Sequence, residues 1–269
     1  SHNDEETYVK ELAEFQPDAI MCRTEPITAK MMDTCKNLKV IGKQGAGLDN
    51  IDMDHAHAED ITVVYAPAGN ANAVAEHAVM LMLMCAKRFT YVDRQFRGGN
   101  FLVRMGMEHT YDFGMNVIGY DPYLTQDKIG DLCELKATAK EVWEQADFVS
   151  VHLPVVPSTE HSIGREQFSW MKPTASFINC ARGALIKENE LVECLKDGTL
   201  FQAGLDVFEH EPIQESSREL FNLDNVIMTP HMAATTEQSV LNCCTSVAND
   251  IVAVCNGQEP KVKAQKPKF

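Results

Sequence analysis

The feature that most constrains the fold of this chain is an alternation of short apolar runs with longer amphipathic segments. This alternation is typical of parallel β-strands joined by crossover helices. Several of the runs have no polar face, which predicts sheets covered by helices on both sides. We therefore expect an α/β protein. The eight expected strands are Asp18–Cys22, Lys39–Gly42, Ile61–Tyr65, Asn116–Tyr120, Phe148–His152, Ser176–Asn179, Ala203–Val207 and Asn225–Met228.

The expected helices lie between these strands, and two of them have recognisable ends. Thr138 and Glu141 have the spacing of a capping box, and Gly198 is placed to end a helix. The longest helix is apolar on nearly all sides, which indicates burial between two units. The main expected helices cover residues 72–89, 138–146, 188–197 and 236–255.

Charge and hydropathy exclude some classes of function. The 39 acidic residues outnumber the 24 basic ones, and a net charge of −15 argues against binding to nucleic acid. No apolar run approaches the roughly 18 residues of a membrane-spanning helix, and the acidic start does not resemble a signal peptide. We therefore expect a cytoplasmic protein that binds neither nucleic acid nor membrane.

The nine cysteines contain no C-x-x-C pair, and most of them stand inside apolar stretches. Their number is odd and their spacing is irregular, so the sequence predicts reduced, mostly buried thiols. Neither disulfides nor a bound metal ion are expected.

Two candidate functional segments follow predicted strands. Gly45 to Asn50 form a glycine-bearing turn whose backbone N–H groups could hold a carboxylate or phosphate, although a plain tight turn explains it equally well. Asp121 ends a later strand. In a dinucleotide fold, an acid at that place accepts hydrogen bonds from the ribose hydroxyls and favours NAD over NADP. An Asp-Pro turn is the simpler alternative.

A third candidate is dispersed in the sequence. Arg182, Asp206, Glu211 and His231 each lie at or just beyond the carboxyl end of a predicted strand, where open α/β sheets bind their ligands. A guanidinium can hold a carboxylate with two hydrogen bonds, and an imidazole backed by a carboxylate can move a proton. Each residue alone has an ordinary explanation, as a surface ion pair, a loop acid or a loop histidine. Their recurrence at three successive strand ends favours a site.

Seven segments, taken in order, resemble the D-isomer-specific 2-hydroxyacid dehydrogenase family, which includes the D-3-phosphoglycerate dehydrogenases. The resemblance implies two Rossmann-like domains with parallel sheets, NAD as the cofactor, and interconversion of a small D-2-hydroxy acid and its 2-keto acid. It places 3-phosphoglycerate among the candidate substrates. The segments are KVIGKQGAGLDNID (39–52), NANAVAEHAVMLML (70–83), VIGYDPY (117–123), VHLPVVPSTEHSIG (151–164), FINCARGALI (177–186), LDVFEHEP (205–212) and TPHMAATT (229–236).

The resemblance also implies roles for individual residues. Arg182 would hold the substrate carboxylate and keto oxygen, His231 would be the general acid and base, and Glu211 would hydrogen-bond to the imidazole. Further residues implied at the substrate are Gly47, Arg23 and Lys43. Asp206 would face the nicotinamide carboxamide and Asp121 the adenosine ribose. The residues implied to line the cofactor cleft are Ala46, Leu153, Cys180 and Ala181.

Domain organisation and assembly follow from the same resemblance. Residues 1–69 and 236–269 would form the substrate-binding domain, and residues 70–235 the NAD-binding domain. The cleft between them is expected to close on NAD and the substrate, and by the same resemblance the protein is expected to form a homodimer. An alternative stays open, because the C-terminal-binding corepressors resemble this family and use dinucleotides to recruit partners rather than for turnover.

One expected motif is missing. The family's G-x-G-x-x-G turn, with its strand and helix, should stand about 20 residues before Asp121, but there is no room for it. Either residues are missing from the sequence near 111/112, or the protein truly lacks the motif. We favour the first interpretation, because loss of a central strand would leave buried backbone groups of its neighbours unpaired.

Overall fold

The computed structural model describes residues 4–100 and 114–265. Contacts divide the chain into two compact units. Unit 1 comprises residues 1–74 and 234–269, and unit 2 comprises residues 75–233. The chain passes from unit 1 to unit 2 within helix α4 (Ala71–Ala86) and returns shortly before helix α10 (Glu237–Cys255). In the described part of the chain, none of the helices has the length and hydropathy needed to cross a membrane.

Unit 1 is built on a three-stranded parallel sheet of β1 (Ala19–Cys22), β2 (Val40–Lys43) and β3 (Thr62–Tyr65), in that order. Neighbouring residues of β2 face opposite sides, as the pleat of a strand requires. Val40 packs with residues of α10, whereas Ile41 packs in a separate core. Both faces are therefore covered, as the apolar strands predict. The other helices of unit 1 are α1 (Glu5–Phe15), α2 (Ala29–Thr34) and α3 (Met53–Ala58).

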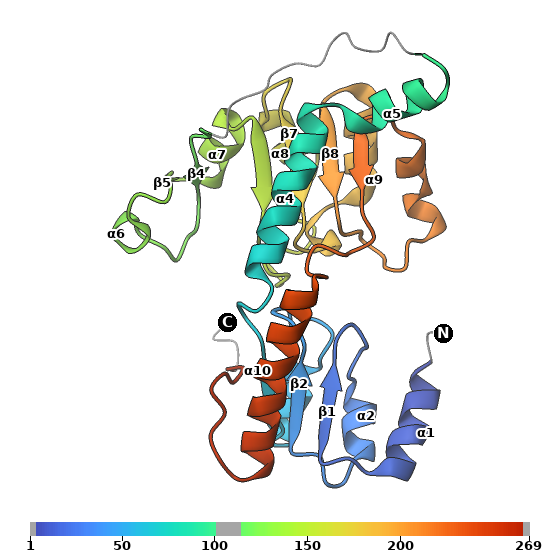
Figure 1. Cartoon of the computed structure of the whole chain (residues 1–269), viewed down its shortest axis with the longest axis vertical. Helices are drawn as coiled ribbons and strands as arrows, with labels where there is room; N and C mark the ends of the chain where they lie inside the picture. The colour runs from blue at the N-terminus through green and yellow to red at the C-terminus, as the bar shows by residue number, and fades with distance from the viewer. Residues whose placement is uncertain (1–3, 101–113, 266–269) are drawn as a thin grey trace. The chain divides into compact units, whose positions relative to one another are not determined.

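Unit 2 contains a four-stranded parallel sheet in the order β6-β7-β8-β9 and a separate parallel pair, β4 with β5. In Figure 1, α4 lies on one face of the four-stranded sheet and α8 and α9 on the other. The strands are β4 (Ile118–Gly119), β5 (Glu134–Leu135), β6 (Phe148–Val151), β7 (Ser176–Asn179), β8 (Gln202–Leu205) and β9 (Val226–Met228). The remaining helices are α5 (Phe89–Arg97), α6 (Gln126–Ile129), α7 (Ala139–Gln145), α8 (Arg165–Trp170) and α9 (Glu188–Asp197), with 3-10 turns η1 (Gly183–Leu185) and η2 (Glu215–Asn222).

The two faces of this sheet pack differently. On one face, the rings of Trp143, Phe168 and Phe177 stack or meet edge to face, with Trp143 and Phe177 centroids 5.7 Å apart. On the other face, α4 comes so close that a Cβ on Gly204 would lie 3.0 Å from the Cβ of Leu81. A glycine in β8 therefore allows α4 to pack directly on the strand.

The structure confirms all eight expected strands, most of them shifted or shortened by one or two residues. Thr138 caps α7 as expected, and Gly198 ends α9 in the left-handed conformation with φ of 81°. The predicted long helix over 72–89 is wrong at its end, because it stops at Ala86. Arg88 adopts a left-handed φ of 48°, and the separate helix α5 follows it.

The arrangement of strands in unit 2 bears on the missing motif. A doubly wound sheet in the order 3-2-1-4-5-6 places its first strand between the second and fourth. Here β5 and β4 correspond to the third and second strands, and β6 to the fourth. Within residues 114–233 and 75–100, no strand joins β4 to β6. The predicted break near 111/112 itself lies outside the described residues.

Candidate active site

Three neighbouring strands bring the dispersed candidate residues to one edge of unit 2. Strands β7, β8 and β9 are parallel and in register, so their carboxyl ends lie together. Arg182 lies three residues beyond β7, Asp206 directly follows β8, and His231 lies three residues beyond β9. The loops that follow adjacent parallel strands meet at this edge, which is where such sheets bind ligands.

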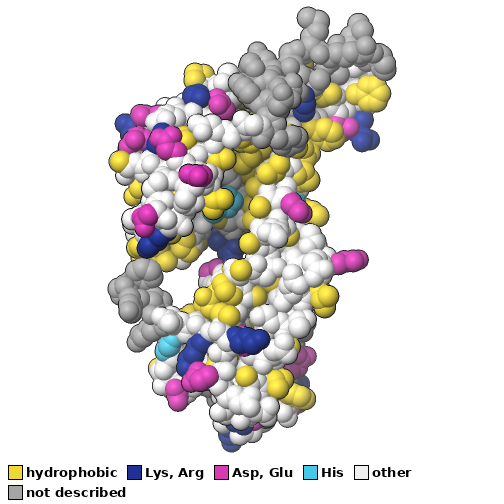
Figure 2. Space-filling model, turned by 60° about the vertical axis from the view of Figure 1, so that its left-hand side comes forward, with side chains coloured by type: hydrophobic (Ala, Val, Ile, Leu, Met, Phe, Trp, Pro, Cys, Tyr) yellow, Lys and Arg dark blue, Asp and Glu magenta, His cyan; other side chains and the backbone are white. Residues whose placement is uncertain are grey.

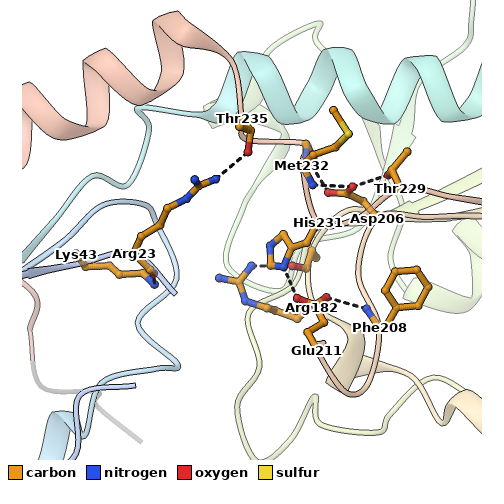
Figure 3. A network of polar contacts seen from close by, with 12 residues as sticks. Arg23, Lys43, Arg182, Asp206, Phe208, Glu211, Thr229, His231, Met232 and Thr235 are labelled. Atoms are coloured by element: carbon orange, nitrogen blue, oxygen red, sulfur yellow. Dashed lines mark hydrogen bonds and ion pairs between the residues drawn. The ribbon is translucent and has the colours of Figure 1, made fainter. Parts of the chain in front are cut away.

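The pair formed by Glu211 and His231 is the central contact of this edge. The Nδ1 atom of His231 lies 2.5 Å from Oε2 of Glu211, and Figure 3 shows the ring turned toward that carboxylate. The other carboxylate oxygen accepts a hydrogen bond from the backbone N–H of Phe208 at 2.9 Å. Because Nδ1 donates to a carboxylate, the neutral ring carries its lone pair on Nε2. The His231 side chain is 38% exposed, so a small molecule can reach it.

The backbone of His231 is held in an uncommon conformation. Its φ is 49°, in the left-handed region that side chains other than glycine rarely adopt. The carbonyl of Asp206 accepts a hydrogen bond from the His231 N–H at 2.8 Å. The Asp206 carboxylate accepts hydrogen bonds from Thr229 Oγ1 at 2.5 Å and from the backbone N–H groups of Met232 at 2.9 Å and Ala233 at 2.8 Å. This buried carboxylate therefore fixes the turn that presents the imidazole.

Arg182 stands on a loop that is tied down by the side chain of Asn179. The amide of Asn179 donates to the Arg182 carbonyl and accepts from the Ala181 N–H, both at 2.9 Å. The Arg182 guanidinium donates to the Ala181 carbonyl at 2.7 Å. A Cβ on Gly183 would lie 1.9 Å from the backbone of Phe208. Glycine thus lets the Arg182 loop touch the loop that carries Glu211.

Asn179, Gly183 and Thr229 support the loops of this candidate site, and the sequence predicted no role for them. Asn179 and Gly183 lie on either side of Arg182 within one short segment, and this closeness in sequence was a sign that they belong to the same loop. Thr229 also stands two residues before His231. Their roles depend on contacts between loops that are far apart in the sequence, and the pattern of residue types alone does not reveal those contacts.

The substrate residues predicted in unit 1 have different surroundings. Lys43 is 7% exposed, and its ammonium donates to the Arg23 carbonyl and, at 2.6 Å, to Oδ1 of Asn50. Arg23 is exposed, and its guanidinium donates to Thr235 Oγ1 at 2.8 Å. A small pocket of unit 1 is lined by Arg23, Gln44, Gly45, Asn70 and the start of α10. Contact of these two cations or of Gly47 with the substrate stays a prediction.

The predicted cofactor residues follow the ends of several strands. Asp121 lies two residues after β4 and accepts a hydrogen bond from the Tyr123 N–H at 2.7 Å, so it also forms the simpler turn. Leu153, beyond β6, is 39% exposed. Ala181 and Cys180 follow β7. Burial and the nearby negative charge of Asp206 raise the pKa of the Cys180 thiol to about 12.

These residues fit a dinucleotide as far as the described edge extends. An acid after β4, an exposed apolar side chain after β6 and a close-packed loop after β7 are the surroundings that a ribose and flat rings require. Ala46 belongs to unit 1 and is exposed. The Asp206 carboxylate is fully buried and hydrogen-bonded within the protein. Its contact with the nicotinamide stays a prediction, as do the other cofactor contacts.

Comparison with known proteins identifies the family. Residues 105–233 match the family model for the D-isomer specific 2-hydroxyacid dehydrogenase, NAD binding domain. The chain is 35% identical over 236 residues to the hydroxypyruvate reductase of Thermotoga maritima, covering 79% of this chain and 76% of that protein. The chain belongs to the D-isomer-specific 2-hydroxyacid dehydrogenase family. The resemblance inferred from the seven segments is thus confirmed, and so is NAD as the cofactor of its nucleotide-binding domain.

Other members of the family extend the comparison. The chain is 39% identical over 255 residues to the D-3-phosphoglycerate dehydrogenase of Methanocaldococcus jannaschii, covering 86% of this chain and 48% of that protein. It therefore spans about half the length of this and several other curated relatives. Among solved structures, the glyoxylate reductase of Paecilomyes thermophila superposes with a TM-score of 0.85 at 27% identity, covering 96% of this chain and 88% of that one.

Proposed function

We propose that the protein is an NAD-dependent oxidoreductase that interconverts a D-2-hydroxy acid and its 2-keto acid. The observation that carries the proposal is the 2.5 Å contact between Glu211 and His231 at the carboxyl edge of the sheet. The ring is oriented by a carboxylate on one side and exposed on the other, which is the arrangement of a general acid and base. Membership of the dehydrogenase family supports the same reaction.

In the direction of oxidation, neutral His231 accepts the proton of the substrate hydroxyl at Nε2. Glu211 stabilises the imidazolium that forms, since its carboxylate already accepts the Nδ1 proton. In the direction of reduction, the imidazolium returns that proton to the substrate oxygen. Arg182 holds the substrate carboxylate and stabilises negative charge on the reacting oxygen. NAD supplies the hydride acceptor when it is bound.

We assign the two units different tasks. Unit 2 contains the segment that matches the NAD-binding family model, and we place the cofactor there. Asp121, Leu153, Cys180, Ala181 and Asp206 are its proposed contacts. Unit 1 is the proposed substrate-binding domain, to which Gly47, Arg23 and Ala46 belong. Lys43 supports the loop of Arg23, because its ammonium is hydrogen-bonded to the Arg23 carbonyl.

The substrate acid is the least specified part of the proposal. The curated relatives include D-3-phosphoglycerate dehydrogenases and a hydroxypyruvate reductase. A phosphorylated acid requires further cations besides Arg182. Arg97 is exposed and paired with Asp93 at 2.7 Å, and Arg104 lies outside the described residues. We therefore propose 3-phosphoglycerate as one member of a substrate class that also includes small unphosphorylated 2-hydroxy acids.

A homodimer and a cytosolic location complete the proposal. Hydrophobic side chains form several patches on the face drawn in Figure 2. Large apolar side chains are exposed along α4 and α5, and in a family that forms homodimers such helix faces are where a second copy would pack. These residues are Val79, Met80, Leu83, Phe89 and Phe96. Free cysteines, six of them buried, agree with a reducing compartment.

An assay of NADH consumption against a panel of 2-keto acids tests the proposed activity. We expect turnover with at least one small 2-keto acid, and its loss in the His231→Ala variant. Measurable NADH affinity without turnover of any acid would contradict the proposal. That outcome would favour the alternative, a dinucleotide-dependent binding protein.

A further inference from the structure

A second histidine lies behind the turn that carries His231. His77 belongs to α4 and stands 152 residues before Thr229, the residue that its ring contacts. Its Nε2 atom lies 2.9 Å from Thr229 Oγ1 and 3.4 Å from Oδ1 of Asp206. The His77 side chain is 10% exposed, and Asp206 is fully buried. Burying polar groups this deeply costs free energy unless they are hydrogen-bonded, so the contacts among these three side chains stabilise this part of the fold.

The direction of these hydrogen bonds follows from the number of protons available. The hydroxyl of Thr229 has one proton, and at 2.5 Å from the Asp206 carboxylate it donates that proton to Oδ1. The Thr229 oxygen therefore accepts from His77, which places a proton on Nε2 of that ring. The result is a chain of three groups, running from α4 through the hydroxyl to the carboxylate.

The same carboxylate holds the backbone of the His231 turn. It accepts from the N–H groups of Met232 and Ala233, while the Asp206 carbonyl accepts from the His231 N–H. These contacts maintain the left-handed φ of His231. Any rotation of the Asp206 side chain would therefore move the backbone from which the imidazole projects.

We propose that His77 is a positioning residue for the acid–base reaction of His231. It orients the Thr229 hydroxyl, which orients the Asp206 carboxylate, which fixes the turn of residues 229–233. The inference rests on the proposed function of His231. His77 does not touch the reacting atoms and acts only through this turn. Its removal leaves the Thr229 hydroxyl held only by Asp206, which loosens the turn and allows the imidazole to shift from its position opposite Glu211.

The test uses a pair of substitutions at His77. His77→Gln retains an N–H donor at about the same reach, and His77→Leu removes the donor while keeping an apolar side chain of similar size. Glu76→Gln, an exposed neighbour on the same helix, is the control. For His77→Leu, we expect kcat to fall about 10- to 100-fold, with KM within about threefold of the unsubstituted protein. His77→Gln should recover kcat to within about threefold.

A second readout does not depend on turnover. In protein labelled at histidine, the ring signals of His231 are assigned by their loss in His231→Ala. We expect them to shift in His77→Leu and to return in His77→Gln. If His77→Leu does not fold, the pair Thr229→Val and Thr229→Ser provides the same comparison at the hydroxyl.

Each outcome decides one of the two proposals. Unchanged kcat and unchanged His231 signals in a folded His77→Leu protein would overturn the positioning role. So would an equal loss in both His77 variants, accompanied only by a lower melting temperature, because this would show a structural role. If the unsubstituted protein turns over no 2-keto acid, the proposed function fails, while the signals of His231 still test the positioning role.

Discussion

The carboxyl edge of unit 2 and the loops of unit 1 that carry Arg23 and Lys43 divide polar side chains in the same way, but the buried charge is an anion in one and a cation in the other. In unit 2, the buried carboxylate of Asp206 accepts hydrogen bonds that fix a turn, and the imidazole that this turn carries is left 38% exposed. In unit 1, the cation Lys43 is itself buried and hydrogen-bonded to its neighbours, while Arg23 is exposed. In both units, the buried charged side chain holds the local backbone, and the exposed side chain is the one that a substrate can reach.

Apart from substitution of His231 itself, the largest expected effect on this comparison is at Arg182. Its replacement by Lys keeps the charge but removes the planar pair of N–H donors that can hold a carboxylate. We expect kcat/KM for the best 2-keto acid to fall about 10²- to 10³-fold. Affinity for NADH, measured by fluorescence titration, should change little. A variant with ordinary kcat/KM would remove Arg182 from the site.

Gly183 tests whether the loops of Arg182 and Glu211 must touch. A methyl group at this position would meet the Phe208 backbone at 1.9 Å, and backbone cannot move aside easily. We expect Gly183→Ala to lower the free energy of unfolding by about 3 kcal/mol, measured by urea denaturation. Gly198→Ala is a useful contrast, since nothing lies within 4 Å of it and only its φ of 81° is strained. Equal losses in the two variants would refute the close approach.

Substitutions of Lys43 and Arg23 distinguish a residue that stabilises the fold of unit 1 from one that we propose to contact the substrate. Lys43→Met leaves two part-buried oxygen acceptors without their donor, so the free energy of unfolding should fall by about 2 kcal/mol. Arg23→Gln should leave stability within about 0.5 kcal/mol, because exposed contacts contribute little. We expect Arg23→Gln instead to raise KM. The reverse pattern, in which Arg23 sets stability and Lys43 sets KM, would invalidate the distinction.

The smallest effect concerns thiol chemistry at the edge of unit 2. With a pKa of about 12, Cys180 stays a protonated thiol at pH 8, whereas Cys255 is exposed. The thiolate is the form that reacts with iodoacetamide, so the exposed Cys255 should be labelled well before Cys180. At pH 10 only a small minority of Cys180 is thiolate, so its labelling should still be much slower than that of Cys255. Peptide mass analysis after timed labelling gives the order, and early labelling of Cys180 would contradict its burial.

Much of the fold follows from patterns that are local in the sequence. Apolar runs mark the strands because a parallel sheet covered on both faces leaves no polar side, and Thr138 and Gly198 mark helix ends through short-range hydrogen bonding and φ. Strand β5 was missed because its residues, Glu134 and Leu135, do not stand in an apolar run. Helix α5 was missed because the break at Arg88 comes from a left-handed residue that is not glycine.

Less of the candidate site than of the fold could be predicted from the sequence. The placement of Arg182, Glu211 and His231 at one edge was predictable because parallel strands bring their carboxyl ends together, a rule that needs no side-chain detail; their roles stay a prediction. His77 was not found, because its contact with Thr229 depends on how α4 packs across the sheet. The phosphate-binding turn has no counterpart in the sequence. An intact mass near 30.0 kDa would show that the motif is truly absent, and a larger mass with the additional residues mapped by peptide sequencing to the 111/112 junction would show that residues are missing there.

The central claim is that His231, held by Glu211, moves the proton in a 2-hydroxy acid oxidoreduction. The measurement that tests it most directly is the kcat of His231→Ala beside its NADH dissociation constant, with the best 2-keto acid of the panel. We predict that kcat falls by about 10²- to 10⁴-fold, the usual contribution of a positioned acid or base, and that NADH affinity is retained. Unchanged turnover in this variant would contradict the account.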